Sequence, residues 1–206
     1  AFGFPKCRIN IIVEYTDGSK QTLKSDESWK VTADGPIRAN NEYDGEEYDA
    51  RMELGNWTTV GFDDTKWLKA ERTDIPYGTS RGQMTPNMTE EKLQIKPVVN
   101  VVDGKTIIDF GQNIAGWISF IPRGNAGDTI KIKYAEKLNE DGTLYLENLR
   151  DAQSEDIYIC NGKETQPWHA AFSYHGFRYA QITGMKNVNA DDFTALVVSD
   201  KMQTTG

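Results

Sequence analysis

Ile107-Ile108-Asp109-Phe110-Gly111-Gln112-Asn113-Ile114-Ala115-Gly116-Trp117 is the most informative stretch of this sequence. Residues 106–110 before the Gln-Asn pair and residues 117–121 after it are rich in β-branched and aromatic side chains, which favours strands. Gly111 and Gly116 allow the backbone to bend or to take a positive φ. We therefore expect two strands joined by a kinked loop. Its amides, Gln112 and Asn113, either satisfy buried backbone groups or contact a ligand.

The rest of the chain repeats this pattern of short strands and turns. Residues 7–15 alternate between apolar and polar side chains, which predicts a half-buried strand followed by a turn at Asp17-Gly18. Ile130, Ile132 and Tyr134 alternate with lysines, so one face of that segment should lie in a core. Turn signals recur about every 8–12 residues and helical periodicity is nearly absent. The sequence therefore predicts an all-β fold built as a sandwich or jelly roll.

Length and composition predict two domains. The chain has 206 residues, of which 38% are hydrophobic, enough for one large or two ordinary domains with cores. Residues 76–87 are rich in Gly, Pro and small polar residues, which indicates a boundary. We expect a first domain over 1–75, a linker over 76–91, a second domain over 92–200 and a tail over 201–206.

Charge and cysteine content exclude some functions. The net charge of −8 argues against nucleic acid or an anionic membrane surface as a partner, because both attract basic faces. No apolar run approaches the ~20 residues of a membrane span. Cys7 and Cys160 lack metal-ligand spacing, and we expect two separate buried thiols rather than a disulfide.

The acidic segment over 44–49 is the candidate metal site. Asp44, Glu46 and Asp49 could supply closely spaced oxygen ligands to Ca²⁺. A solvated acidic loop is the commoner outcome for such a segment. In another interpretation Asp49 or Glu53 forms a surface ion pair with Arg51, which would contribute little stability.

Aromatic residues near this segment are candidate sugar contacts. Trp57, Tyr43 and Tyr48 could stack on the C–H faces of a pyranose ring, although aromatic residues of small sandwiches more often belong to the core. His175 is expected at a turn among core aromatics. With 31 acidic residues, no pair of carboxyl groups stands out as a hydrolytic pair, and no catalytic residue is assigned.

Six motifs resemble a known family. "IIDFGQNIAGW", "RGNAGDTIKIKYAEKLNEDGTLYLENLR" and "FSYHGFRYAQITG" are similar to the accessory β-sandwich of bacterial α-L-rhamnosidases. "SDESWKV", "YDGEEYDARME" and "GFDDTKWLKA" resemble the end of the N-terminal domain of the same enzymes. The resemblance spans almost the whole chain in the family's order. It implies two jelly-roll-like β-sandwich domains, the first of them incomplete because its early strands would precede Phe2.

The resemblance also implies a function. The family removes terminal L-rhamnose from plant glycosides or polysaccharides, and its catalytic residues belong to a helical barrel that would follow this chain. The chain alone is therefore expected to be non-catalytic and to have that barrel and a rhamnose-containing carbohydrate as partners. In some members the N-terminal domain binds rhamnose with calcium. The parent is expected in the periplasm or outside the cell, with a cytoplasmic location left open.

Two alternatives accompany this interpretation. In the first, the chain is a purely structural module that supports the barrel and has no ligand of its own. Burial of Trp57, Tyr43 and Tyr48 would favour it. In the second, the chain is an independent hydrolase, which turnover of an aryl rhamnoside would reveal.

Overall fold

The computed structural model describes residues 6–74, 78–79, 81–82, 88–163, 166–202 and 205. Strands dominate, and the helices of these residues are three short 3₁₀ turns: Ala50–Met52, Glu147–Leu149 and Ala190–Asp192. The all-β prediction is therefore confirmed. None of the described helices is long and apolar enough to cross a membrane.

The chain forms two compact units whose limits differ from the expected domains. One unit combines Ala1–Asp34 with Leu54–Gly82, and the other combines Gly35–Glu53 with Gln83–Gly206. The segment over 35–53, expected in the first domain, thus belongs to the second unit. Much of the predicted linker lies outside the described residues, and its final residues form strand β7 (Met88–Lys92).

The first unit consists of two small antiparallel sheets. Strand β1 (Asn10–Glu14) pairs with β2 (Lys20–Lys24), and β3 (Lys30–Val31) pairs with β6 (Leu68–Lys69). The hairpin at Asp17-Gly18 is confirmed, but the prediction of a half-buried strand is wrong, because of β1 only Val13 is even partly covered. No hydrophobic side chain among the described residues of this unit is buried.

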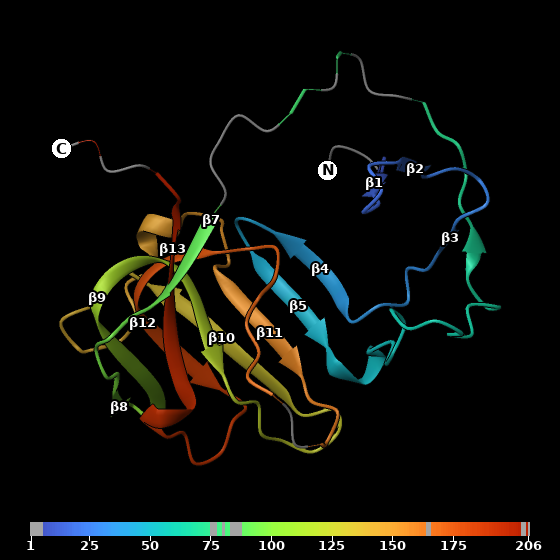
Figure 1. Ribbon diagram of the computed structural model, residues 1–206. Helices are drawn as coiled ribbons and strands as arrows, with labels where there is room; N and C mark the ends of the chain where they lie inside the picture. The colour runs from blue at the N-terminus through green and yellow to red at the C-terminus, as the bar shows by residue number, and fades with distance from the viewer. Residues whose placement is uncertain are drawn as a thin grey trace. The chain divides into compact units, whose positions relative to one another are not determined.

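The second unit contains one nine-stranded, curled sheet (Figure 1). Its order is β4-β5-β11-β10-β12-β9-β13-β7, and β8 pairs with β9 beside this path. The strands not yet given are β4 (Ile37–Asn41), β5 (Gly45–Asp49), β8 (Val98–Val102), β9 (Lys105–Phe120), β10 (Thr129–Ala135), β11 (Glu155–Ile159), β12 (His175–Thr183) and β13 (Phe193–Asp200). The β5–β11 pair is parallel, and the other pairs given for this sheet are antiparallel.

Strand β9 corrects the expectation of two strands joined by a loop. Its 16 residues form one strand, whose two halves both pair with β12 across a register shift between Phe177 and Tyr179. On its other side, β9 pairs first with β8 and then with β13. Gly111, with a φ of 76°, lies at the change of partner. The strand therefore bends from one part of the curled sheet to the next without ending.

Gly116 serves a different purpose from the expected bend. A Cβ atom at this position would lie 1.9 Å from the carbonyl oxygen of Leu196 in β13. Its φ is not positive, so the glycine is needed for close approach of two backbones rather than for an unusual conformation.

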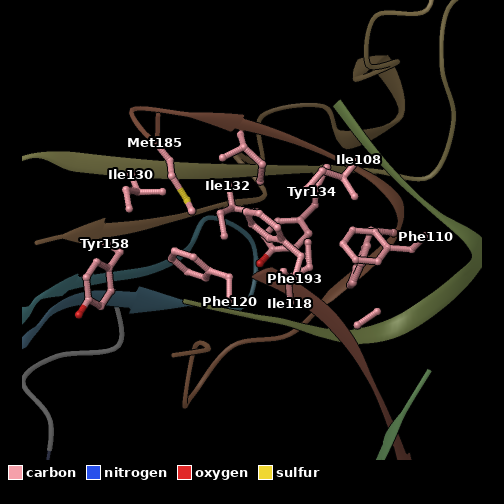
Figure 2. Packing of buried hydrophobic residues seen from close by; sticks show 14 of the residues in the cluster. Ile108, Phe110, Ile118, Phe120, Ile130, Ile132, Tyr134, Tyr158, Met185 and Phe193 are labelled. Carbon is pink, nitrogen blue, oxygen red and sulfur yellow. The ribbon is translucent and has the colours of Figure 1, made fainter. Parts of the chain in front are cut away.

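The core lies inside the curl of this sheet. Figure 2 shows Ile108, Phe110, Ile118 and Phe120 of β9 packed with side chains of other strands, and all four are almost completely buried. Ile130, Ile132 and Tyr134 are buried as their alternation predicted. Each such side chain contributes roughly 1.5–3 kcal/mol on burial. A smaller cluster around Ile107, Ala135 and Leu144 covers a second face, so both faces of β9 are packed.

Candidate functional site

The predicted acidic loop is a β-hairpin formed by β4 and β5. The Asn41 side-chain oxygen accepts hydrogen bonds from the backbone N–H groups of Tyr43 and Asp44, which fixes the turn. Gly45 follows with a φ of 106° and approaches the backbone of Glu155 too closely for any side chain. Strand β5, which contains Glu46 and Asp49, begins directly after this turn.

The two outer carboxylates have protein partners. Asp44 accepts hydrogen bonds from Asn41 Nδ2 at 2.9 Å and from the Gln153 backbone at 3.2 Å, and these lower its pKa. Asp49 receives the Arg51 guanidinium at 2.9 and 2.7 Å, which holds the pKa of that carboxyl below its usual value. Of the two expected partners of Arg51, Asp49 forms the ion pair, and Glu53 instead accepts a hydrogen bond from the Tyr48 hydroxyl.

Glu46 is buried rather than solvated, with 1% of its surface exposed. Its carboxylate accepts hydrogen bonds from the backbone N–H groups of Ala171 and Phe172, at 3.1–3.2 Å, and from Asn40 Nδ2 at 3.0 Å. Burial raises the pKa of Glu46 despite these donors, and the charge of Asp156 adds to the increase. Glu46 therefore ties β5 to the segment before β12.

Asp44, Glu46 and Asp49 are not gathered around a common point. Among the described residues, no group of three or more histidine, cysteine, aspartate or glutamate side chains is arranged to hold a metal ion. Calcium binding by this hairpin stays a prediction.

A buried polar network lies behind the hairpin. Asp156 accepts hydrogen bonds from the Tyr134 hydroxyl at 2.6 Å and from the Glu46 backbone at 2.9 Å, and its Oδ1 lies 3.1 Å from His175 Nε2. The His175 ring stacks on Tyr134 with 4.0 Å between ring centroids. The prediction of His175 at a turn is wrong, because it begins β12, while its aromatic surroundings were foreseen. Asp156 and His175 are both buried, so this network belongs to the interior of the second unit.

Sequence reasoning did not identify Asp156 as part of this network. The signal was present in the alternation of β11, because Asp156 and the buried Tyr158 share one face of the strand. A carboxylate on an inward-facing position predicts buried donors opposite it.

Tyr48 is partly buried and packs against the main core cluster. Its ring stacks on Tyr158 with centroids 5.6 Å apart and lies tilted against Trp168 at 5.5 Å. Its hydroxyl donates to Glu53 at 3.1 Å. Burial raises the pKa of Tyr48. Of the three aromatic candidates, Tyr48 is therefore the one whose ring packs against other aromatic side chains of the chain.

Tyr43 and Trp57 are exposed, by 67% and 55%. Tyr43 lies at the tip of the β4–β5 hairpin in the second unit, and Trp57 belongs to the first unit. Two further exposed aromatics, Phe172 and Tyr174, were missed by sequence reasoning. They alternate along the segment that Glu46 anchors, and the backbone carbonyl of the buried Ser173 between them accepts a hydrogen bond from the Trp117 indole.

The amides of β9 are exposed, so the prediction that they satisfy buried backbone groups is wrong. Asn113 Nδ2 donates to Glu136 Oε1 at 2.9 Å, and Asn148 Nδ2 approaches Glu136 Oε2 at 3.4 Å. We call Asn113, Glu136 and Asn148 the amide patch. A carboxylate between two amides offers hydrogen-bond donors and acceptors side by side, as neighbouring sugar hydroxyls require.

An ion pair next to the amide patch stabilises the bend of β9. The Arg178 guanidinium binds both Asp109 oxygens at 2.9 Å across the β9–β12 pair. Asp109 also accepts a hydrogen bond from the Gly111 backbone at 2.7 Å. Asp109 and its hydrogen bonds therefore hold the bend of β9 that carries Asn113.

The curled sheet with its interior core places the second unit among concanavalin-like β-sandwiches. Residues 99–199 match the family model described as the bacterial α-L-rhamnosidase concanavalin-like domain, and residues 3–92 match the α-L-rhamnosidase N-terminal domain. The chain belongs to the bacterial α-L-rhamnosidase family.

Individual relatives agree with these matches. An α-L-rhamnosidase of Formosa agariphila is 37% identical over 215 residues, which cover 100% of this chain and 22% of the relative. One from Streptomyces avermitilis is 36% identical and covers 87% of this chain and 18% of its own length. The chain thus spans about a fifth of the length of these relatives.

Solved structures show the same fold. The crystal structure of the Streptomyces avermitilis α-L-rhamnosidase complexed with L-rhamnose matches with a TM-score of 0.85 and 33% identity, over 93% of this chain and 19% of that one. The native α-L-rhamnosidase of Aspergillus terreus matches with a TM-score of 0.84 and 35% identity, over 94% of this chain and 23% of that one.

Proposed function

We propose that this chain is a non-catalytic, carbohydrate-binding part of an α-L-rhamnosidase that removes terminal L-rhamnose from plant glycosides or polysaccharides. The amide patch is the observation that carries the proposal. It presents Asn113 and Glu136, joined at 2.9 Å, on an exposed bend. A neutral sugar suits this surface better than an anion, because the patch contains a carboxylate and the chain carries a net charge of −8.

Two exposed aromatics support sugar binding by offering faces on which a pyranose could stack. Tyr43 and Trp57 both retain more than half of their surface in solvent. A solved relative was crystallised with L-rhamnose, which makes this sugar the first ligand to test. Calcium is part of the proposal as a cation whose effect on binding is to be measured.

The comparison of lengths supports the non-catalytic part of the proposal. The relatives called α-L-rhamnosidases are about five times longer than the matched region, so their activity can reside elsewhere. Within the described residues, the two most buried carboxylates, Glu46 and Asp156, hold the fold together through hydrogen bonds to backbone and side-chain donors. Their burial keeps them from a substrate.

Calorimetric titration with L-rhamnose, once with calcium and once with chelator, tests sugar binding. Saturable heat is expected for the wild-type chain, and Asn113→Ala should weaken binding by about 1 kcal/mol, the usual contribution of one hydrogen bond. Asn10→Ala, an exposed asparagine on strand β1, is the matched control and should leave binding unchanged. Absence of heat in both conditions would refute the binding proposal.

Hydrolysis of an aryl α-L-rhamnoside tests the second part. The isolated chain is expected to give no turnover. Turnover that survives repurification would show that these 206 residues form a hydrolase by themselves.

A purely structural module is the second candidate function. The observation in its favour is Tyr48, whose ring packs on Tyr158 and Trp168 instead of facing a ligand. This function predicts no sugar binding by the chain and a gain in its stability when it is joined to the remainder of the parent enzyme.

A further inference from the structure

Strand β8 (Val98–Val102) is an edge strand with an apolar surface. It pairs with β9 on one side, and no other strand among the described residues pairs with it. Val98 and Val101 are 56% and 71% exposed. Natural sheets usually protect such edges with charged side chains or bulges, and β8 contains no charged residue. The backbone of its outer side is therefore available for another strand.

The sequence of β8 is symmetric. It reads Val-Val-Asn-Val-Val, with Asn100 at the centre. Two copies of this strand can pair antiparallel about a two-fold axis through Asn100. Each valine then faces a valine of the other copy, and Asn100 faces Asn100. Val98 then faces Val102 of the other copy. Contacts of this kind are the ones that a closed, isologous dimer needs.

The burial pattern of β8 complements itself in the same register. Val99 packs against the main core cluster and Val102 against the smaller one, so both are partly covered within one chain. The more exposed valines would lie opposite these two, because Val98 faces Val102 and Val101 faces Val99 of the second copy. Cross-strand pairs of β-branched residues stabilise sheets.

We propose that two copies of this chain associate through β8, which pairs with itself antiparallel and centred on Asn100. The sheet then runs without interruption from β12, β9 and β8 of one copy into the same strands of the other. The occupant of the edge is a second copy because the strand's sequence is complementary to itself. This inference does not depend on the carbohydrate proposal.

Disulfide trapping tests the register. Cys7 is exposed and is first replaced by serine, while the buried Cys160 is retained. In this background Asn100→Cys should form a disulfide-linked dimer under mild oxidation, because directly opposed residues of antiparallel strands have Cα atoms about 4.5–5.5 Å apart. Val101→Cys is the matched control. Position 101 faces Val99 of the other copy, so the two introduced thiols lie too far apart for efficient linkage. Equal trapping at both positions would overturn the register.

Sedimentation equilibrium over a range of concentrations tests the association itself. The wild-type chain should show a reversible monomer–dimer equilibrium, and Val101→Lys should raise its dissociation constant by about tenfold or more, because a lysine at an edge opposes pairing. Val60→Lys, at a fully exposed valine of the first unit, is the control and should sediment like the wild type. A wild-type monomer at all concentrations, or a dimer unaffected by Val101→Lys, would overturn the proposal.

Discussion

Asp156 and His175 face each other at 3.1 Å inside the second unit, and neither side chain is more than 2% exposed. Asp156 belongs to β11 and His175 to β12, with β10 between them in the sheet. Tyr134 of β10 donates its hydroxyl to the same carboxylate. One side chain thus joins three neighbouring strands through polar contacts inside an apolar core, where unpaired polar groups are most costly.

Replacement of Asp156 by alanine should strongly destabilise the chain. The change leaves the Tyr134 hydroxyl and the Glu46 backbone N–H without their acceptor. Each buried donor left without its acceptor costs about 1–3 kcal/mol. Urea unfolding followed by tryptophan fluorescence measures this loss. Asp151→Ala, at an exposed position of the same unit, is the control, and an equal effect of both changes would refute the assigned role.

The ionisation of Glu46 should make the free energy of unfolding depend on pH. Burial raises the pKa of this carboxyl above its ordinary value of 4.5, so the folded chain keeps a proton that the unfolded chain has released. Between these two pKa values the free energy of unfolding contributed by Glu46 falls as the pH rises, because the unfolded state binds fewer protons.

Glu46→Gln should remove this component. The variant's free energy of unfolding is expected to decline less than that of the wild type as the pH rises from about 4.5, since glutamine does not ionise. Urea unfolding at a series of pH values gives the difference between the two proteins. A difference that is independent of pH would show that Glu46 titrates normally.

Gly116→Ala should disrupt the pairing of β9 with β13. The added Cβ atom would lie 1.9 Å from the Leu196 carbonyl oxygen, a backbone atom that cannot move without opening the sheet. A loss of about 3 kcal/mol or more in unfolding free energy is expected. Gly35→Ala adds the same methyl group where nothing lies within 4 Å and should have little effect. Similar stability of the two variants would contradict the close approach.

The two cysteines should differ in reactivity. Cys7 is exposed, whereas Cys160 is buried, and burial raises the pKa of its thiol. Because the thiolate is the reactive form, Ellman's reagent should modify one thiol rapidly in the native chain and two in denaturant. Cys7→Ser should abolish the rapid phase. Two rapid thiols in the native chain would show that Cys160 is accessible.

The strands and the family could be predicted from the sequence because both are recorded in local patterns. Alternation identified Ile130, Ile132 and Tyr134 as core residues, and glycine-containing dipeptides marked the hairpins. The expected thiol burial was correct for Cys160 and wrong for Cys7. Alternation could not predict that β1 is exposed. Alternation shows that a strand has an apolar face, but it does not show that another part of the chain covers that face.

The tertiary relationships could not be predicted because their partners lie far away along the chain. Glu46 was expected in a solvated acidic loop or as a calcium ligand, and the sequence could not show that its carboxylate accepts hydrogen bonds from the backbone N–H groups of residues 171 and 172. Asn113 looked like a buried structural amide, yet it lies exposed beside Glu136. In both cases the local sequence indicated the chemistry of the side chain, and the fold determined what it contacts.

The parallel pairing of β5 with β11 has a consequence for the order of folding. The Glu46 backbone N–H donates to Asp156 although 110 positions separate the two residues, so this contact can form only after residue 156 has been synthesised. Contacts of such long range make folding slow. During synthesis β5 has no partner strand on this side until β11 has been made. A cut between the two regions that match family models would separate β5 from β11, so each piece would lack strands of the sheet.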